Sequence, residues 1–205
     1  MVLIGYSGHA FVAYGILKTA GNEATAYCDS EEKSYNPYHI PYLGKETSEV
    51  GLKEIRRSGF FISIGDALLR KKVYDNLVML NLYPLNAIHT SAIIDESVDL
   101  SGKGILIAAG ALINPLSKIG NGVVCNTGCI IEHECIVQDF VQVAPGAVLC
   151  GNVQVGCGSF IGAGAVIRQG ITIGENVTIG AGAVVIRNIG DNETVVGNPS
   201  RLLRV

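Results

Sequence analysis

The chain has 205 residues, room for one large domain or two small ones, and a net charge of -3 at neutral pH. Hydrophobic residues make up 48% of the sequence and charged residues 16%, so its charge balance favours neither nucleic acid nor an anionic membrane as a partner. We expect no secretory signal and no membrane span, because the opening residues lack a basic start and the longest apolar run, GILIAAGALI, is short and interrupted by glycine.

Residues 1–86 alternate short apolar runs with segments of helical spacing. The predicted strands lie within residues 2–10, 24–29 and 60–66, and the predicted helices within residues 11–21, 47–57 and 67–81. Gly21 suits the end of the first helix, and Thr47 or Ser48 suits the start of the second. Strands that alternate with helices form a parallel sheet, so this part is predicted to be a Rossmann-like α/β domain, with residues 30–45 as a polar loop.

From residue 94 onward, apolar residues recur every six positions. One extra residue within SGKG shifts the register after Ile94 and Leu100, and the series then continues without a polar member. Its positions are Ile107, Ile113, Ile119, Cys125, Ile131, Val137, Val143, Leu149, Val155, Ile161, Ile167, Ile173, Ile179 and Val185. A fixed hexapeptide period is typical of a β-helix, in which each hexad supplies one short strand and one corner. Three hexads make one coil, so residues 18 apart are expected to stack.

This series predicts a second domain, a parallel β-helix over residues 87–205 with a short C-terminal tail. Cys125, Cys129 and Cys135 fill its inward or small-residue positions, which explains them structurally. The chain's six cysteines form no CxxC pair, so we expect reduced thiols, a cytoplasmic location and no metal site.

Four segments follow one another in an order known from one protein family: GYSGHA, IGDALLRKKVY, NTGCIIEHECIV and VVGNPSRLLR. With them the whole chain resembles the bacterial hexapeptide-repeat sugar acetyltransferases of the UDP-4-amino-sugar N-acetyltransferase and sialic acid O-acetyltransferase group. The resemblance implies a left-handed β-helix, a homotrimer, acetyl-CoA as co-substrate and a role in glycan biosynthesis.

His133 follows the inward Ile131 by two residues, which places it at a corner with its side chain outward. One interpretation is an exposed turn histidine without a role. The other is a general base, because imidazole can exchange a proton near neutral pH and Glu134 could orient the ring. The resemblance favours the base, since the histidine of the matching EHE segment has that proposed role in the family.

Gln142 stands where similar enzymes commonly have a second histidine, thought to hydrogen-bond the thioester carbonyl. A glutamine amide can still donate a hydrogen bond to an oxyanion, but it cannot act as an acid or a base. The alternative is an ordinary surface glutamine. The departure leaves open whether catalysis persists.

Spacing separates these residues within one chain. His133 and Gln142 are nine residues apart, half a coil, and so lie on opposite sides of the prism. Asn126 lies sixteen residues before Gln142, nearly one coil below it on the same side. We therefore predict an active site at a subunit boundary, with Asn126 as a positioning donor and His133 supplied by a neighbouring chain.

The resemblance also implies binding residues. Backbone groups at Gly151, Ala163 and Ala181 match positions that contact pantetheine in similar enzymes, although the turns of the repeat alone explain small residues there. Arg201 and Arg204 are weaker candidates for contacts to phosphate. In the first domain, the residues that match a nucleotide-sugar site are Gly5, Ser7, Gly8, His9, Asp29, Gly65 and Asp66. The turn that opens the first helix suits phosphate, Asp29 suits a ribose or base, and Arg70 either reaches a phosphate or sits on its helix surface.

The sequence thus predicts direct acetyl transfer from acetyl-CoA to the amine of a nucleotide-linked sugar, expected to be a UDP-4-amino-4,6-dideoxy sugar. Two alternatives stay open: O-acetylation of a sugar hydroxyl, and a non-catalytic trimeric scaffold or sugar-binding protein, which Gln142 would suit. A zinc hydratase on the same fold is excluded by count, because His133 is the only histidine between residues 94 and 205.

Overall fold

The computed structural model describes residues 1–203 and forms two compact units, Met1–Thr90 and the chain from Ser91 onward. The first is an α/β unit with a parallel sheet and the second is a parallel β-solenoid, so the predicted order of fold classes is confirmed. Whether the two functional domains meet at residue 86, as the sequence predicts, stays a proposal. Among residues 1–203, no helix combines the length and apolar character that a bilayer span requires.

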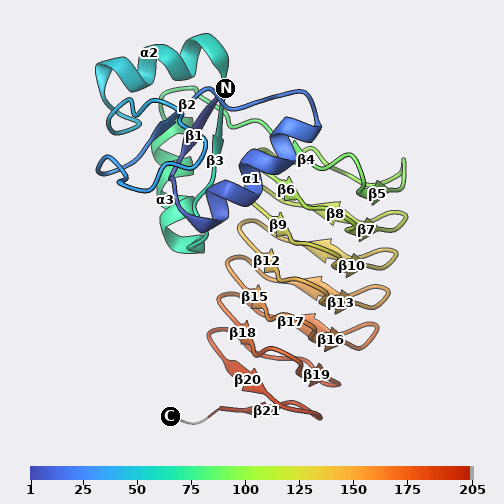
Figure 1. Ribbon diagram of the computed structural model, residues 1–205. Helices are drawn as coiled ribbons and strands as arrows, with labels where there is room; N and C mark the ends of the chain where they lie inside the picture. The colour runs from blue at the N-terminus through green and yellow to red at the C-terminus, as the bar shows by residue number, and fades with distance from the viewer. Residues whose placement is uncertain (204–205) are drawn as a thin grey trace. The chain divides into compact units, whose positions relative to one another are not determined.

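The first unit is built on a three-stranded parallel sheet (Figure 1). Its strands are β1 (Val2–Ile4), β2 (Ala26–Cys28) and β3 (Phe60–Ile62), and its helices are α1 (Gly8–Thr19), α2 (Glu49–Ser58) and α3 (Ala67–Val78). The strand order is β2-β1-β3, with Leu3 level with Tyr27 on one side and Phe61 on the other. All residues of these strands are buried, as expected of a parallel sheet covered on both faces. Each of the six predicted elements is confirmed.

The helix ends match their sequence signals. The Ser48 hydroxyl accepts a hydrogen bond from the Gly51 N–H at 3.0 Å, which caps α2. After α1, Gly21 has a φ of +75°, and its N–H bonds to the Lys18 carbonyl. The polar segment that follows β2 is a loop, as predicted, and it is fixed by a parallel bridge between Tyr27 and Tyr42. The short strand β4 (Ala87–Ile88) lies near the end of this unit.

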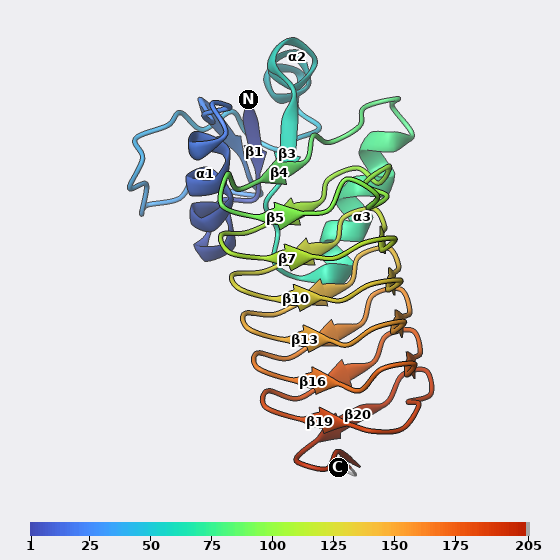
Figure 2. The same ribbon diagram turned by 90° about the vertical axis from the view of Figure 1, so that its right-hand side faces the viewer.

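The solenoid has three walls, taken here in the order in which each coil visits them. The first wall, which faces the viewer in Figure 2, stacks β5 (Ile93–Ile94), β7 (Leu112–Ile113), β10 (Ile130–Ile131), β13 (Val148–Leu149), β16 (Val166–Ile167) and β19 (Val184–Val185). The second wall stacks β8 (Lys118–Ile119), β11 (Ile136–Val137), β14 (Gln154–Val155) and β17 (Thr172–Ile173). The third wall stacks β6 (Leu106–Ile107), β9 (Val124–Cys125), β12 (Gln142–Val143), β15 (Phe160–Ile161), β18 (Thr178–Ile179) and β20 (Thr194–Val196), and β21 (Arg201–Leu202) pairs antiparallel with β20.

The predicted register is confirmed along the solenoid. Ile131 pairs with Ile113 below and Leu149 above, each one coil away. Ile94 pairs with Ile113, one residue further than the repeat, which is the predicted extra residue. Every inward position of the hexapeptide series from Ile107 to Val185 is at most 3% exposed, including Cys125. The core is therefore one continuous apolar column.

Between the walls lie three corners: the first joins the first and second walls, the second joins the second and third, and the third returns to the first. Between residues 104 and 182, each corner turn ends on a residue with positive φ, most often glycine or asparagine. These residue types tolerate the left-handed conformation best. The corners therefore determine which positions face outward, and this sets the geometry of the candidate site.

Candidate active site

His133 and Glu134 form the first corner between β10 and β11. The imidazole Nδ1 lies 3.1 Å from the Glu134 Oε2, and the two side chains are 57% and 59% exposed. At that exposure the pair adds little to stability, but it orients the ring. If Nδ1–H donates to the carboxylate, the lone pair is on Nε2, the arrangement that a general base requires.

Gly151 lies one coil above His133, against the imidazole. A Cβ placed on Gly151 would lie 2.5 Å from both the Cε1 and the Nε2 atoms of the His133 ring. A larger residue at position 151 would displace the ring from this position. Among residues 1–203, the Gly151 N–H donates no backbone hydrogen bond, whereas the neighbouring Asn152 N–H bonds to the His133 carbonyl at 2.8 Å.

Glu134 adopts a left-handed conformation, with φ of +59°. In the next two coils the same corner position is occupied by Asn152 and Gly170, the types that suit it best. Leu116 in the coil below shows that the corner imposes the conformation on any residue. A glutamate at this position is thus explained by its contact with His133 and not by the backbone.

Gln142 and Asn126 lie on the other side of the prism. Gln142 opens β12 on the third wall, level with Val124 below and Phe160 above. Asn126 precedes the third corner, and its side-chain oxygen accepts the Thr127 N–H at 2.8 Å, which leaves its amide NH2 group for a ligand. Within one chain the structure therefore does not bring His133 together with Gln142 or Asn126.

The three predicted pantetheine contacts also occupy two different corners. Gly151 is at the first corner, while Ala163 and Ala181 stack one coil apart at the third corner, where both are exposed. A single chain does not place all three in one groove. Arg201 is exposed in β21, and Arg204 lies outside the described residues.

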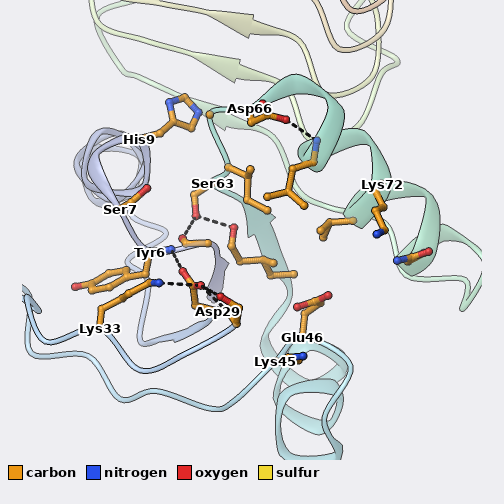
Figure 3. Close-up of a pocket in the computed structure, with 18 residues that line it drawn as sticks. Tyr6, Ser7, His9, Asp29, Lys33, Lys45, Glu46, Ser63, Asp66 and Lys72 are labelled. Atoms are coloured by element: carbon orange, nitrogen blue, oxygen red, sulfur yellow. Dashed lines mark hydrogen bonds and ion pairs between the residues drawn. The ribbon is translucent and has the colours of Figure 1, made fainter.

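The first unit contains a separate cavity of about 740 Å³ at the carboxyl end of its sheet (Figure 3). Its lining includes all but one of the predicted nucleotide-sugar residues, namely Gly5, Ser7, His9, Asp29, Gly65 and Asp66. Gly8 is exposed and does not line the cavity. Gly5 is required, because its φ is +88° and a Cβ would lie 2.6 Å from the Ile64 side chain. The carboxyl edge of a parallel sheet is the usual place for a ligand.

Asp29 ties together the loops on one side of this cavity. Its carboxylate accepts the Tyr6 N–H at 2.8 Å and the Ser30 N–H at 2.6 Å, and the Lys33 ammonium lies 3.2 Å away. Burial alone would raise the pKa of Asp29, but these donors together hold it below its usual value. Most of the acceptor capacity of this carboxylate is therefore used within the protein, and little remains for a ribose or a base.

The opposite side of the cavity is fixed by α3. Asp66 accepts the Leu69 N–H at 2.7 Å and so caps the helix. Arg70 is 1% exposed, and its guanidinium donates to the carbonyls of Ile64 and Gly65 at 2.9 and 2.8 Å. Burial lowers the pKa of Arg70 to about 10, against the opposing effect of Asp66. The interpretation of Arg70 as a helix-surface residue was wrong, because the side chain is buried and holds the β3–α3 loop in place. Arg70 does not line the cavity, and its contact with a phosphate stays a prediction.

His9 has a buried nitrogen that lacks a partner. Among residues 1–203, its Nε2 is the one buried side-chain nitrogen or oxygen without a hydrogen bond. Burial, reinforced by the positive charge of Arg70, lowers the pKa of His9 to about 4. The ring is therefore neutral near pH 7 and offers one unused hydrogen-bonding atom beside the cavity.

Sequence reasoning missed several polar residues of the cavity, among them Lys45 and Glu46, just before α2, and Lys72 and Asn76 on α3. One signal was available, since Leu69, Lys72, Val73 and Asn76 follow helical spacing along one face of α3. No comparable pattern marks Lys45 and Glu46. Among residues 1–203, no three His, Cys, Asp or Glu side chains gather closely enough to hold a metal ion.

Comparisons with known proteins agree with this arrangement. A family model described as the PglD N-terminal domain matches residues 1–77, and one described as bacterial transferase hexapeptide (six repeats) matches residues 152–187. A curated relative, GDP-perosamine N-acetyltransferase of Escherichia coli O157:H7, is 30% identical over 104 residues, which are 51% of this chain and 47% of that protein. This alignment thus spans about half of the relative's length.

Several solved structures resemble nearly the entire chain, among them two with CoA or acetyl coenzyme A. A mutant of perosamine N-acetyltransferase from Caulobacter crescentus, in complex with CoA and GDP-perosamine, has a TM-score of 0.92 and 33% identity, and the match covers 100% of this chain and 96% of that one. The acetyltransferase domain of PglB from Neisseria gonorrhoeae, in complex with acetyl coenzyme A, has a TM-score of 0.88 and 30% identity, with 98% of each chain covered. From its repeat, its two units and these relatives, the chain belongs to the family of hexapeptide-repeat sugar acetyltransferases.

Proposed function

We propose that this protein transfers acetyl from acetyl-CoA to the amine of a nucleotide-linked amino sugar, with His133 as general base. The observation that supports this most strongly is the exposed His133–Glu134 pair, seated against Gly151. The similar structures are N-acetyltransferases, one with CoA and GDP-perosamine and one with acetyl coenzyme A. The six cysteines are free thiols, which fits a cytoplasmic location, where acetyl-CoA is available.

The chemistry needs one proton acceptor and one group that stabilises an oxyanion. The sugar amine attacks the thioester carbonyl, a C–N bond forms, and the amine proton passes to His133 Nε2, while Glu134 stabilises the resulting imidazolium. Collapse of the tetrahedral intermediate breaks the C–S bond, and the proton returns to the leaving thiolate to give CoA. The Gly151 N–H, beside the ring and without a backbone acceptor in the described part of the chain, suits the oxyanion, and Gln142 supplies a second donor.

We propose a homotrimer as the source of that second donor. The outward residues of the first wall form an unbroken apolar column: Ile93, Leu112, Ile130, Val148, Val166 and Val184. The second wall presents Lys118, Gln154 and Thr172 beside a single apolar residue, Ile136. A continuous apolar face of this kind is suited to burial against copies of the same chain.

This face lies between the first and third corners. If three prisms turn their first walls toward a common axis, the first corner of one chain meets the third corner of the next. One chain then supplies His133, Glu134 and Gly151. Its neighbour supplies Asn126, Gln142, Ala163 and Ala181, so a site at the boundary contains the groups that one chain keeps apart.

The nucleotide part of the acceptor is assigned to the cavity of the first unit. Phosphate suits the turn that opens α1, because the N–H groups of a first helical turn have no helical carbonyl to bind and no acidic residue occupies that turn. The N–H groups of Gly5 and Tyr6 are already bonded within the protein, to the Cys28 carbonyl and to Asp29. His9 Nε2, neutral and without a partner in the described chain, provides one further hydrogen bond. Lys33 lies at the rim, where its ammonium is paired with Asp29 and Glu31.

The test is the product mass after incubation with acetyl-CoA and either a GDP-linked or a UDP-linked 4-amino-4,6-dideoxy sugar. Mass is preferable to a thiol reagent, because the protein's own six cysteines would react. A gain of one acetyl group on either sugar is expected. Binding of the sugar without acetyl gain would contradict the proposal and favour a hydroxyl acceptor, or a binding protein in which Gln142 has ended catalysis.

A further inference from the structure

The cavity of the first unit has a polar side that the proposed function leaves unassigned. We call it the Glu46 side, and it consists of Lys45, Glu46, Lys72 and Asn76. In Figure 3 the labelled members Lys45, Glu46 and Lys72 lie away from Ser7 and His9, with Glu46 and Lys45 on the loop before α2 and Lys72 on α3. If phosphate is held at the turn that opens α1, the Glu46 side is available to the other end of a nucleotide.

The cavity contains three carboxylates, and two of them are occupied. Asp29 accepts hydrogen bonds from Tyr6 and Ser30 and pairs with Lys33, and Asp66 caps α3. Glu46 differs from both: within residues 1–203 it makes no hydrogen bond or ion pair, and it is only partly exposed. It is thus the carboxylate whose two oxygens are both available to a ligand.

The chemistry of the neighbours narrows the choice of ligand group. Lys45 and Lys72 stand on the same side and outnumber Glu46, so a cationic ligand group beside Glu46 is disfavoured. A neutral group with two adjacent donors fits better, because it can bind both oxygens of one carboxylate side by side. Guanine offers such an edge, formed by its N1–H and its 2-amino group. Uracil offers a single N–H between two carbonyl oxygens, which a carboxylate repels.

We propose that Glu46 recognises the guanine edge, so that the acceptor substrate is linked to GDP and not to UDP. The inference rests on the proposed function, since it deepens the assignment of this cavity to a nucleotide sugar. Glu46 has no part in the acetyl transfer itself. Nucleotide binding therefore tests it without any measurement of catalysis.

The experiment is titration calorimetry of the full chain with GDP, IDP and UDP. IDP is the sharpest probe, because inosine differs from guanosine only by the missing 2-amino group. We expect GDP to bind about 10–100-fold more tightly than UDP and about tenfold more tightly than IDP. In Glu46→Gln the preference for GDP over IDP should fall to about twofold or less, because one acceptor oxygen has become a donor.

Glu49→Gln is the matched control, because Glu49 is exposed on α2 and does not line the cavity. It should keep the wild-type preferences. Equal affinity for UDP and GDP in the wild type, or an unchanged ratio of GDP to IDP in Glu46→Gln, would overturn the inference. An equal loss for all three nucleotides would assign Glu46 to the ribose instead. If no nucleotide binds at all, the proposed function fails along with the inference.

Discussion

Different kinds of interaction hold the structures of the two units in place. In the first unit individual loops are held by their own side-chain hydrogen bonds. The Asp29 carboxylate accepts the Tyr6 N–H, and the buried Arg70 guanidinium donates to a carbonyl of the β3–α3 loop. In the second unit one coil is repeated, with backbone hydrogen bonds to the next coil and one apolar residue inward per strand. Candidate chemistry follows the same division: it lies in loops after strands in the first unit and at outward corners in the second.

The largest expected effect comes from breaking the inward column of the solenoid. Ile173 is 1% exposed at the second position of β17, and Thr172 beside it faces outward. Ile173→Ala should lower the free energy of unfolding by about 2–5 kcal/mol, since it removes buried methyl groups and leaves a cavity. Thr172→Ala should change it by less than about 0.5 kcal/mol. Similar losses for both variants, measured by urea unfolding, would contradict the assigned inward and outward faces.

The next effect concerns acid sensitivity in the first unit. Because the pKa of His9 is about 4 in the folded chain and near 6.5 when exposed, the unfolded chain binds an extra proton between these values. Stability should therefore be complete above about pH 6.5 and decline toward pH 4, by up to about 3 kcal/mol. His9→Gln should remove much of this decline in unfolding curves recorded from pH 7 to pH 4. Exposed His39 supplies the control, and an equal benefit from His39→Gln would show that His9 is not the cause.

A smaller effect on kcat is expected when one glycine of each unit is replaced by alanine. In Gly151→Ala the new Cβ would displace the His133 ring, and a shift of about 1 Å in a catalytic group can lower kcat about 10–100-fold. Gly15 in α1 has nothing within 4 Å of an added Cβ. Gly15→Ala should leave kcat unchanged and raise stability by about 0.5–1 kcal/mol. The expected result for Gly151→Ala is a lower kcat with little change in KM, and wild-type kcat would disprove the steric role of Gly151.

Most of the fold could be predicted because its signals are local. The hexapeptide period marks inward residues such as Ile131 and Leu149 without knowledge of any long-range contact, and even the extra residue before Ile107 is visible in the sequence. The helix start at Ser48 is equally local. These features depend on neighbours in the chain or on a constant repeat.

The candidate site could be predicted only in part. His133 and Glu134 are adjacent, so their pairing was accessible from the sequence, whereas the contact of Gly151 with the imidazole depends on side-chain direction across one coil. Arginine is usually found at the protein surface, and only the packing of α3 shows that Arg70 is buried. Glu46 and Lys72 come from separate elements that meet at the cavity, without a motif to join them.

The most direct test of the account is the turnover number of His133→Ala in acetyl transfer to the amino sugar. We predict a loss of about 10²–10⁴-fold with an unchanged unfolding transition, because the exposed ring contributes to proton transfer and not to the core. Turnover within about twofold of the wild type would contradict the assignment of His133 as the base.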